Sequence, residues 1–532
     1  MSQPRPILEG EDYKTTQNQE VGSIYSIKLS DEKHGHQANG QIKKCGWNDR
    51  HTFALMNLLG QCIAFMNRGC LSVAIVAMVS SSNSTREADG QNDACPVPES
   101  HNDTLGPEKE GEFNWDEQLQ GVVLGSFFYG YASSCFIGGI LTDYFGGRLM
   151  FGVSIMGLSL LSVLSPISAR TSVELFIANK VISGMLQGPM YPSFHSLMAS
   201  RIPLHLRAKY NSICLTGSTF GNVFAMALGG VMASSSFLGG WPSVFYVFGA
   251  SGILWSILWF FLIEEIPKKS VLPPEDIHSQ RRNKLKEVHF KNILTSAPFW
   301  CLVFFHFGDS FGYYMLSTEI PTYLNNIQHV DLAKNGLLSA LPYILQIFFS
   351  MAWGIAINRL IISGRISILA SRRISSAVGM YCAGLALVAM CFVNCNFSLA
   401  VAVLCIAVAI TGASNSGGYL GEQDMCPPSL VGVIKGMSNT LASTTGFIAP
   451  LVTGSIIVGN ETLSAWRTAF LIAAALYIIP GTIYLVFMTE KVQPWIKSEN
   501  KMDHCWPSET SPAHSFTRNP GSEEVPGVQW EY

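Results

Sequence analysis

Apolar stretches recur along the chain and are separated by shorter polar segments. A helix needs roughly 20 consecutive apolar residues to cross a bilayer, and about twelve stretches of this length are present. They cover residues 53–79, 118–141, 149–169, 173–199, 208–233, 244–263, 299–324, 332–357, 374–393, 399–420, 431–457 and 466–488. The pattern predicts an all-α membrane protein with twelve transmembrane helices in two six-helix halves.

Polar segments divide the chain further. Residues 1–50 are rich in Gln, Ser, Glu, Lys and Gly and contain no signal peptide, and residues 490–532 have a similar composition. We expect both to be disordered cytosolic tails. Between them we expect a first half at 51–264, a cytosolic linker at 265–297 and a second half at 298–489.

The distribution of charge orients the predicted helices. Basic residues collect at Arg148, at 201–209, in the linker, at 359–373 and at Lys491, which all lie on one side if every segment spans. By the positive-inside rule that side is cytosolic. The acidic loop 80–117 then lies outside or in a lumen, and it contains glycosylation sequons at Asn83 and Asn102.

Composition supports a membrane protein and excludes other classes. Of the 532 residues 48% are hydrophobic and 13% are charged, whereas soluble proteins average roughly 25% charged residues. Most of the thirteen cysteines lie in apolar runs, and neither CxxC pairs nor a zinc spacing occurs, so we expect no disulfide framework, metal or cofactor. Cys95, in the 80–117 loop, has no evident partner there. No nucleophile elbow or Walker loop indicates an enzyme, and the net charge of −3 does not indicate a nucleic-acid partner.

Arg68 lies in the middle of the first apolar stretch. A charge at this depth is costly, so it should face protein or water instead of lipid. We predict that Arg68 faces a cavity and contacts an anion; the alternative is an arginine that snorkels to the headgroups.

A motif follows the second stretch, at residues 139–148. Gly139, Asp143, Gly146 and Arg148 form the pattern GxxxDxxGxR, with glycines for a tight turn and an Asp–Arg contact that breaks when the halves move. A degenerate copy at 354–359 has Asn358 in place of the acid. The pattern resembles the signature of the major facilitator superfamily, and we therefore expect that superfamily's fold.

Several further stretches resemble one branch of that superfamily, the anion:cation symporters that include sialin, the vesicular glutamate transporters and the type I sodium-phosphate cotransporters. The matching stretches are RGCLSVAIV from Arg68, FNWD from Phe113, GSFFYGY from Gly125, YPSFH from Tyr191, PLHLR from Pro203, GWPSVFYVFG from Gly240 and QPW from Gln493. The resemblance implies a secondary active transporter of organic anions that works by alternating access. Its driving force would be a proton gradient, a sodium gradient or the membrane potential, and Arg68 would meet the substrate's anionic group.

The chain departs from the family pattern at four positions. The fourth-helix arginine and glutamate of the family are here Lys180 and Gln187, so a cation is kept and a titratable acid is lost. The histidine and arginine of the glutamate carriers are here Leu124 and Asp309, which argues against a glutamate transporter. Two alternatives stay open: a sodium-dependent inorganic phosphate cotransporter, and a transport-inactive receptor or scaffold.

Helical spacing groups the candidate site residues. Lys180 and Gln187 share a face with Tyr191, and we expect Lys180 and Gln187 to bind substrate with Arg68 unless Lys180 snorkels. Tyr129, Tyr131 and Tyr313 offer hydroxyls to an anion or pack in the core. Pro189 and Pro192 should kink the fourth helix.

Acidic residues of the second half are the candidates for ion coupling. His306, Asp309 and Tyr313 share a stripe, and Glu319 lies nearer the outer end. We expect Asp309, with Glu319 and His306, to bind the coupling proton or sodium ion, unless Asp309 pairs with a basic residue. His195 is interpreted as a structural hydrogen-bonding residue. Glu422 and Asp424 are interpreted as helix-end charges, with an inner gate as the alternative. The exact substrate, the oligomeric state and the choice between lysosomal, vesicular and plasma membrane stay open.

Overall fold

The computed structural model describes residues 47–79, 111–264, 290–328, 332–457, 462–489, 491 and 493. These ranges are helical throughout apart from loops and one isolated bridge between Val79 and Phe113. Thr52–Tyr532 forms one compact unit, and the description that follows concerns this unit.

The first half contributes helices that follow the predicted stretches closely. They are α2 (Trp47–Met78), α3 (Glu117–Phe145), α4 (Gly147–Thr171), α5 (Val173–Gln187), α6 (Met190–Arg201), α7 (Arg207–Ser234) and α8 (Pro242–Leu262), with short 3₁₀ turns η1 (Leu204–Leu206) and η2 (Phe237–Gly239).

The second half has more interruptions. Its helices are α10 (Phe290–Leu294), α11 (Ala297–Asn326), α12 (Leu332–Ile362), α13 (Ile368–Ala377), α14 (Ala383–Met390), α15 (Phe397–Thr411), α16 (Gly421–Met425), α17 (Val431–Ile457) and α18 (Leu463–Phe487). A π-helical turn, η3 (Val378–Cys382), joins α13 to α14, and two 3₁₀ turns, η4 (Gly412–Ser416) and η5 (Gly418–Leu420), separate α15 from α16.

Ten helical segments in the described ranges are long and apolar enough to cross a membrane. The other two predicted spans, the fourth and the seventh, are not among these ten segments. The fourth is broken between Gln187 and Met190, with Pro189 at the start of α6, as the two prolines predicted. The seventh is α11, a 30-residue helix whose apolar sequence includes His306 and Asp309. The prediction of twelve helices in two halves is confirmed.

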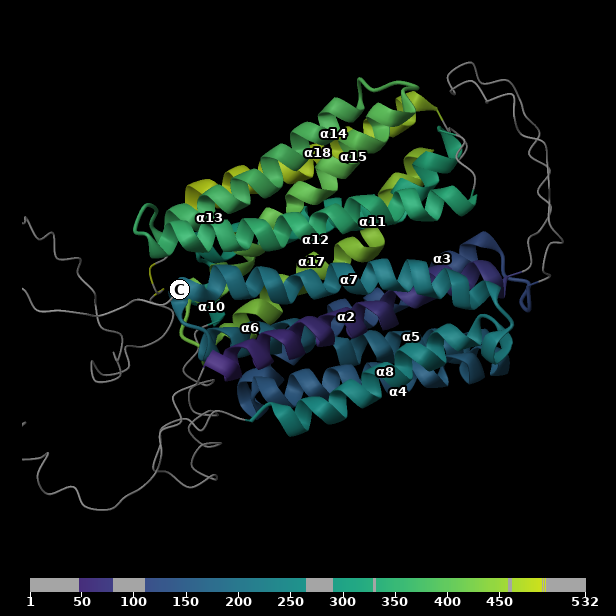
Figure 1. The fold of residues 1–532 in the computed structure, drawn as a ribbon, viewed down its shortest axis with the longest axis horizontal. Coiled ribbons are helices and arrows are strands. Elements are labelled where there is room, and N and C mark those ends of the chain that lie inside the picture. The colour runs from purple at the N-terminus through teal and green to yellow at the C-terminus, as the bar shows by residue number, and fades with distance from the viewer. Residues whose placement is uncertain are drawn as a thin grey trace, which may run out of the picture. The chain divides into compact units, whose positions relative to one another are not determined.

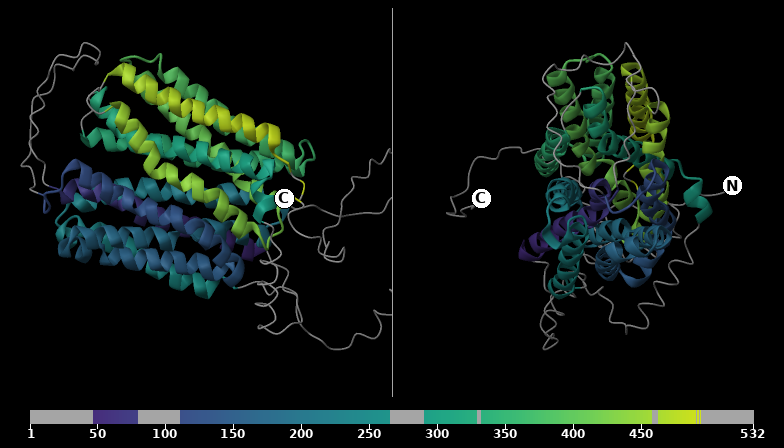
Figure 2. Two further views of the ribbon diagram at one scale, coloured as in Figure 1. Left: turned by 180° about the vertical axis from the view of Figure 1, so that it is seen from behind. Right: turned by 90° about the vertical axis from the view of Figure 1, so that its right-hand side faces the viewer.

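The two ends of the helix bundle are named here by their connections. The linker end is where α8 ends and α11 begins, and the loop end is where α2 ends and α3 begins; in Figure 1 the linker end, with α6, α10 and α13, is on the left. The two groups of helices, α2–α8 and α11–α18, lie side by side in the views of Figures 1 and 2.

The two halves meet along α3 with α17 and α7 with α12. Near the linker end these helices touch closely, because glycines remove the side chains between them. A Cβ on Gly139 would lie 2.4 Å from the Gly432 carbonyl oxygen, and one on Gly354 would lie 2.6 Å from Ser212 Cβ. Two polar bonds close the same end: Asn211 donates to the Asn415 carbonyl at 2.7 Å, and Arg207 donates to the Gln423 carbonyl at 2.9 Å.

Apolar cores lie inside each half. One core in the first half packs Phe151 against Trp259, with ring centroids 5.0 Å apart, and the core of the second half packs Tyr323 against Trp466, 5.2 Å apart. Most of each core is internal to one half, and the surface between the halves combines polar and small residues with aromatic contacts such as Phe128–Tyr314.

Candidate functional site

A large cavity of about 2130 Å³ separates the halves toward the loop end. We call it the loop-end cavity. Its walls come from α2, α3, α4, α5 and α7 of the first half and from α11, α12 and α17 of the second. It includes Ser235, Gly240 and Trp241 at the loop end and extends to Arg68 and Lys180. Since the halves touch at the linker end, the structure is open toward the loop end.

Arg68 lies in the wall of the loop-end cavity, surrounded by aromatic rings. The guanidinium carbon is 4.6–5.3 Å from the ring centroids of Phe65, Phe127, Phe128, Tyr131 and Tyr314. Its NH2 group donates a hydrogen bond to the Tyr314 hydroxyl on α11. This contact joins a cation of the first half to the second half.

Lys180 lines the same cavity from α5 and is buried. Its ammonium group donates to Ser165 Oγ at 2.9 Å and lies over the rings of Phe176 and Phe245, at 5.1 and 4.6 Å. The rings and one hydroxyl stabilise the charge in place of a carboxylate. Lys180 therefore does not snorkel to the surface, and the expected pairing of Arg68 and Lys180 in one cavity is found.

Tyr313 and Tyr314 separate this cavity from a second, smaller one. The Tyr313 hydroxyl accepts a hydrogen bond from Asn222 Nδ2 on α7, so both tyrosines connect α11 to the first half. The smaller cavity, of about 80 Å³, has both tyrosines in its wall. We call it the inner chamber. Its polar lining comprises Tyr131, Tyr191, Ser218, Thr219, Asp309, Ser310, Tyr313, Tyr314, Gln346, Thr411, Asn415, Tyr419, Asn439 and Ser443.

Among the described residues, Asp309 is the only carboxylate that lines the inner chamber. Its side chain is 6% exposed, and its Oδ2 accepts a hydrogen bond from the Tyr419 hydroxyl at 2.9 Å. The alternative that Asp309 pairs with a basic residue is not found: the ion pairs around it join Glu422 to His306 and to Lys435.

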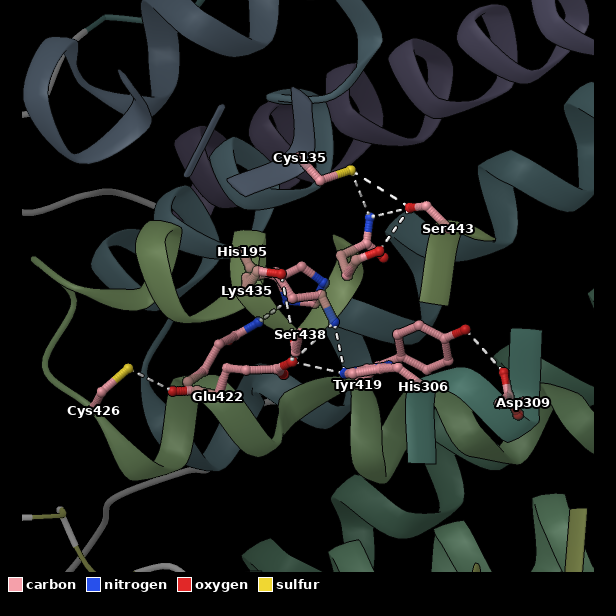
Figure 3. A network of polar contacts seen from close by, with 12 residues as sticks. Cys135, His195, His306, Asp309, Tyr419, Glu422, Cys426, Lys435, Ser438 and Ser443 are labelled. Carbon is pink, nitrogen blue, oxygen red and sulfur yellow. Dashed lines mark hydrogen bonds and ion pairs between the residues drawn. The ribbon is translucent and has the colours of Figure 1, made fainter. Parts of the chain in front are cut away.

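A buried charge cluster lies on the linker side of Tyr419 (Figure 3). Glu422 Oε1 is 2.7 Å from His306 Nε2 and 3.2 Å from Lys435 Nζ, and it accepts a hydrogen bond from Ser438 at 2.7 Å. The side chains of the three charged or titratable residues are at most 1% exposed. The interpretation of Glu422 as a helix-end charge is therefore wrong, because α16 ends inside the bundle and Lys435 of α17 neutralises it. His306 belongs to this cluster and lines neither cavity.

The remaining predicted substrate residues are spread out. Tyr129 lines the loop-end cavity, half-exposed, with its ring 5.2 Å from that of Phe447. Tyr131 faces the inner chamber, where its hydroxyl accepts from Asn439 at 3.1 Å. Gln187, the last residue of α5, is buried, lines neither cavity and contacts Met190 Sδ at 3.7 Å. Glu319 lines the loop-end cavity near its mouth.

The motif residues lie at the linker end, but in two separate contacts. Asp143 accepts hydrogen bonds from the amides of Gly432 and Val433, at 3.2 and 2.8 Å, at the start of α17. Gly146, at φ 98°, turns the chain into α4, and Arg148 in the first turn of α4 donates to the Phe260 carbonyl at 2.6 Å. The expected Asp143–Arg148 contact is not made. In the degenerate copy, Asn358 is buried.

Polar contacts between the halves continue at the linker end. His195 on α6 accepts a hydrogen bond at Nδ1 from Gln423 on α16, at 2.7 Å, which agrees with a hydrogen-bonding role. Asp424 pairs with Arg372 at 2.7 Å. Asp424 therefore does balance a basic segment, as the sequence suggested.

A cluster at the rim of the loop-end cavity holds the segment that precedes α3. Glu112 accepts hydrogen bonds from Arg170 at 2.8 and 3.2 Å and from Trp241 at 2.9 Å. The Arg170 guanidinium lowers the pKa of the Glu112 carboxyl. The glycosylation sequons at Asn83 and Asn102 lie outside the described residues.

The cysteines match the prediction with one exception. Cys62, Cys70, Cys135 and Cys214 are free and buried, like small apolar residues. Cys395 is disulfide-bonded, which corrects the expectation of a chain without disulfides. It lies at the loop end, between α14 and α15.

Sequence reasoning missed several residues at these sites. Lys435 is an intramembrane lysine, and the rule that identified Arg68 would have found it. Tyr314, Asn222 and Tyr419 carry no such signal, since their roles depend on contacts across more than 90 positions of sequence.

Comparison with known proteins identifies relatives over most of the chain. Residues 58–450 match the family described as Major Facilitator Superfamily. The chain is 34% identical over 463 residues to sialin of Homo sapiens, covering 85% of this chain and 91% of sialin. It is 33% identical over 477 residues to a Drosophila melanogaster protein named "Putative inorganic phosphate cotransporter", covering 86% and 88%. Vesicular glutamate transporter 1 of Bos taurus is 29% identical over 85% of this chain and 79% of its own length.

A solved structure shares the fold. The proton:xylose symporter XylE superposes with a TM-score of 0.62 over 83% of this chain and 97% of that one, at 12% sequence identity. At that identity the likeness concerns the arrangement of helices alone.

Proposed function

The chain belongs to the major facilitator superfamily, in the family that includes sialin and the vesicular glutamate transporters, and from this premise we propose that it transports organic anions. It is a multi-pass integral membrane protein. Transport is secondary active and proceeds by alternating access, with an ion gradient or the membrane potential as the driving force.

One observation carries the proposal. Arg68 and Lys180 line a single cavity, and neither has a carboxylate partner among the described residues. Two cations held by rings and hydroxyls gain most from an anion that enters the cavity, since the cost of their burial is only partly offset. The arginine fork adds paired hydrogen bonds to a carboxylate.

The lining of the cavity favours an organic anion over inorganic phosphate. Phe65, Phe127 and Phe128 surround Arg68, so the position next to the cation is mostly apolar. An organic anion presents an apolar body to these rings and its charged group to Arg68, whereas inorganic phosphate would lose its hydration without such contacts. The phosphate alternative rests on the name of the Drosophila relative.

The contact between Arg68 and Tyr314 links binding to movement. An anion on Arg68 replaces the Tyr314 hydroxyl, which weakens a bond between the halves at the floor of the loop-end cavity. Opening at the linker end must then break the Asp143 contact with α17 and the Arg207 contact with Gln423. Binding shifts the equilibrium only by its preference for one of the two states.

The loop end faces outside or a lumen in this proposal, and the linker end faces the cytosol. The disulfide at Cys395 supports this orientation, since disulfides persist in oxidising compartments. Glycosidase treatment should increase the electrophoretic mobility of the wild type and not that of the Asn83→Gln/Asn102→Gln variant. Labelling of residues 80–110 from the cytosolic side would contradict this orientation.

Uptake into proteoliposomes tests the function. Radiolabelled carboxylates with apolar bodies, sialate, glutamate and phosphate should be compared under imposed proton, sodium and voltage gradients. At least one organic anion should accumulate above protein-free vesicles. If phosphate alone accumulates, the inorganic alternative replaces the proposal; if none does, the chain is a receptor or scaffold.

A further inference from the structure

The geometry points to a cation site in the inner chamber: we propose that this chamber binds Na⁺ with Asp309 as its charged ligand. The proposal deepens the transport function, because it names the coupling ion, and its role in coupling rests on that function. The existence of the binding site does not rest on that function.

The donors that line the chamber are those a hard cation requires. Oxygen-bearing side chains converge there from four elements: Asp309 and Ser310 of α11, Gln346 of α12, Thr411 of α15 and Asn415 of η4. Hard cations take several carboxylate, carbonyl, amide and hydroxyl oxygens. A proton site would need only one base and would not require this set of oxygen ligands.

The amide groups are held with their nitrogens committed elsewhere. Gln346 Nε2 donates to Thr411 Oγ1 at 2.7 Å, and Asn415 Nδ2 donates to Ser350 Oγ at 2.9 Å. The Thr411 hydroxyl donates its own hydrogen to the Val408 carbonyl at 2.7 Å. Gln346 Oε1 also accepts a hydrogen bond from Thr219 at 3.3 Å. Amide and hydroxyl oxygens each have two lone pairs, so each keeps one for a ligand in the chamber.

Asp309 supplies a single negative charge that is not neutralised. Its Oδ1 is buried and makes no hydrogen bond of regular geometry with the described residues, although the Ser414 hydroxyl lies close enough to interact with the carboxylate. Lys435, which lies over the ring of Tyr419 on the other side of that residue's hydroxyl contact, is paired with Glu422 and makes no ion pair with Asp309 among the described residues. One carboxylate without an ion-pair partner matches one monovalent cation.

A broken helix forms part of the chamber wall. α15 ends at Thr411, and the next nine residues form 3₁₀ turns before α16 begins at Gly421. The C-terminal end of a helix carries partial negative charge. Secondary transporters of other folds coordinate Na⁺ at interrupted helices, where backbone carbonyls are freed.

The size of the chamber fits a small ion. A volume of about 80 Å³ compares with roughly 30 Å³ for one water molecule in the liquid. The space therefore holds Na⁺ with one or two waters, and no organic anion. Tyr313 and Tyr314 lie between this ion and a substrate on Arg68 in the loop-end cavity.

Direct binding of ²²Na⁺ to purified protein tests the site without knowledge of the substrate. A scintillation proximity assay should show saturable binding by the wild type. Asp309→Asn should weaken it at least about tenfold, because the charged ligand is lost. Thr411→Val should weaken it by a smaller factor, and it serves as the second variant if Asp309→Asn fails to fold. Glu174→Gln, an exposed acid on α5, is the matched control and should bind as the wild type does.

Two results would overturn the site. One is the absence of saturable ²²Na⁺ binding by monodisperse wild-type protein. The other is undiminished binding by both Asp309→Asn and Thr411→Val. A wild type that accumulates an anion in Na⁺-free buffer on a proton gradient and binds no ²²Na⁺ contradicts the cation site while the transport proposal stands. Asp309-dependent binding in a protein that moves no anion supports the site and contradicts the transport proposal.

Discussion

The two halves treat buried charge in opposite ways. The first half places Arg68 and Lys180 in the cavity wall without any acid among their described partners. The second half places acids inside and neutralises Glu422 with Lys435, while Asp309 lies beside a small chamber without an ion-pair partner among the described residues. The difference teaches that charges left unpaired mark the positions where ligands are expected, whereas the paired group has a structural role.

The largest effect is expected at Arg68. Arg68→Ala should reduce anion uptake by about a hundredfold or more, since a charged, paired contact to the substrate is lost. Arg68→Lys should restore part of it, because an ammonium group makes no paired contact. Initial uptake rates at matched expression measure this, with exposed Arg365→Ala as the control. Wild-type uptake rates in Arg68→Ala would contradict the role assigned to the first half in anion binding.

The Glu422–Lys435 pair should matter most for stability. Glu422→Gln leaves Lys435 buried without its acid, which costs about 3–5 kcal/mol in comparable pairs. Glu422→Gln/Lys435→Gln should recover most of that loss. Lys180→Met, which breaks no ion pair, should destabilise less. Thermal unfolding in detergent measures all three, and equal losses for Glu422→Gln and Lys180→Met would contradict the distinction between the halves.

A smaller effect is expected at Tyr314. Tyr314→Phe keeps the ring beside Arg68 but removes the hydroxyl that an anion must displace. The substrate concentration at half-maximal uptake should fall by about threefold to tenfold. Tyr381→Phe, which loses a hydroxyl contact to Thr482, is the control. A rise in the substrate concentration at half-maximal uptake for Tyr314→Phe would mean that the Tyr314 hydroxyl binds the substrate itself.

The smallest effect should appear at the cavity rim and should depend on pH. Arg170 lowers the pKa of Glu112, so their contact stabilises the fold above the ordinary carboxyl pKa of 4.5. That stabilisation is lost as the pH falls through the lowered pKa. The difference in thermal stability between the wild type and Glu112→Gln should be constant from pH 7 to about pH 5 and should vanish in stronger acid. A difference that persists at low pH would show that Glu112 acts by packing.

The spans were predictable because a bilayer imposes a length and an apolar composition on each helix. The break at Pro189 and the depth of Arg68 followed from single residues. The partners of these residues did not follow, since Tyr314 lies 246 positions from Arg68. Gln187 shows the limit of helical spacing: it shares a sequence stripe with Lys180, but α5 ends at Gln187 and only Lys180 reaches the cavity.

The motif shows a similar limit. The sequence identified Asp143 and Arg148 as a unit, but after the turn at Gly146 Arg148 contacts α8, while Asp143 at the end of α3 contacts α17. Glu422 was misread because its neighbours in sequence suggested a helix end, while its partners Lys435 and His306 lie on other helices. A pattern reports the local element, and the pairing of buried charges is decided by how elements pack.

One measurement tests the division of roles most directly: counterflow exchange and gradient-driven accumulation of the same anion, in the same proteoliposome preparations, for Arg68→Ala and Asp309→Asn. Arg68→Ala should lose both activities, because the anion no longer binds. Asp309→Asn should keep exchange and lose accumulation, because the anion binds but the gradient is no longer coupled. Full accumulation by Asp309→Asn, or loss of exchange equal to that of Arg68→Ala, would contradict the account.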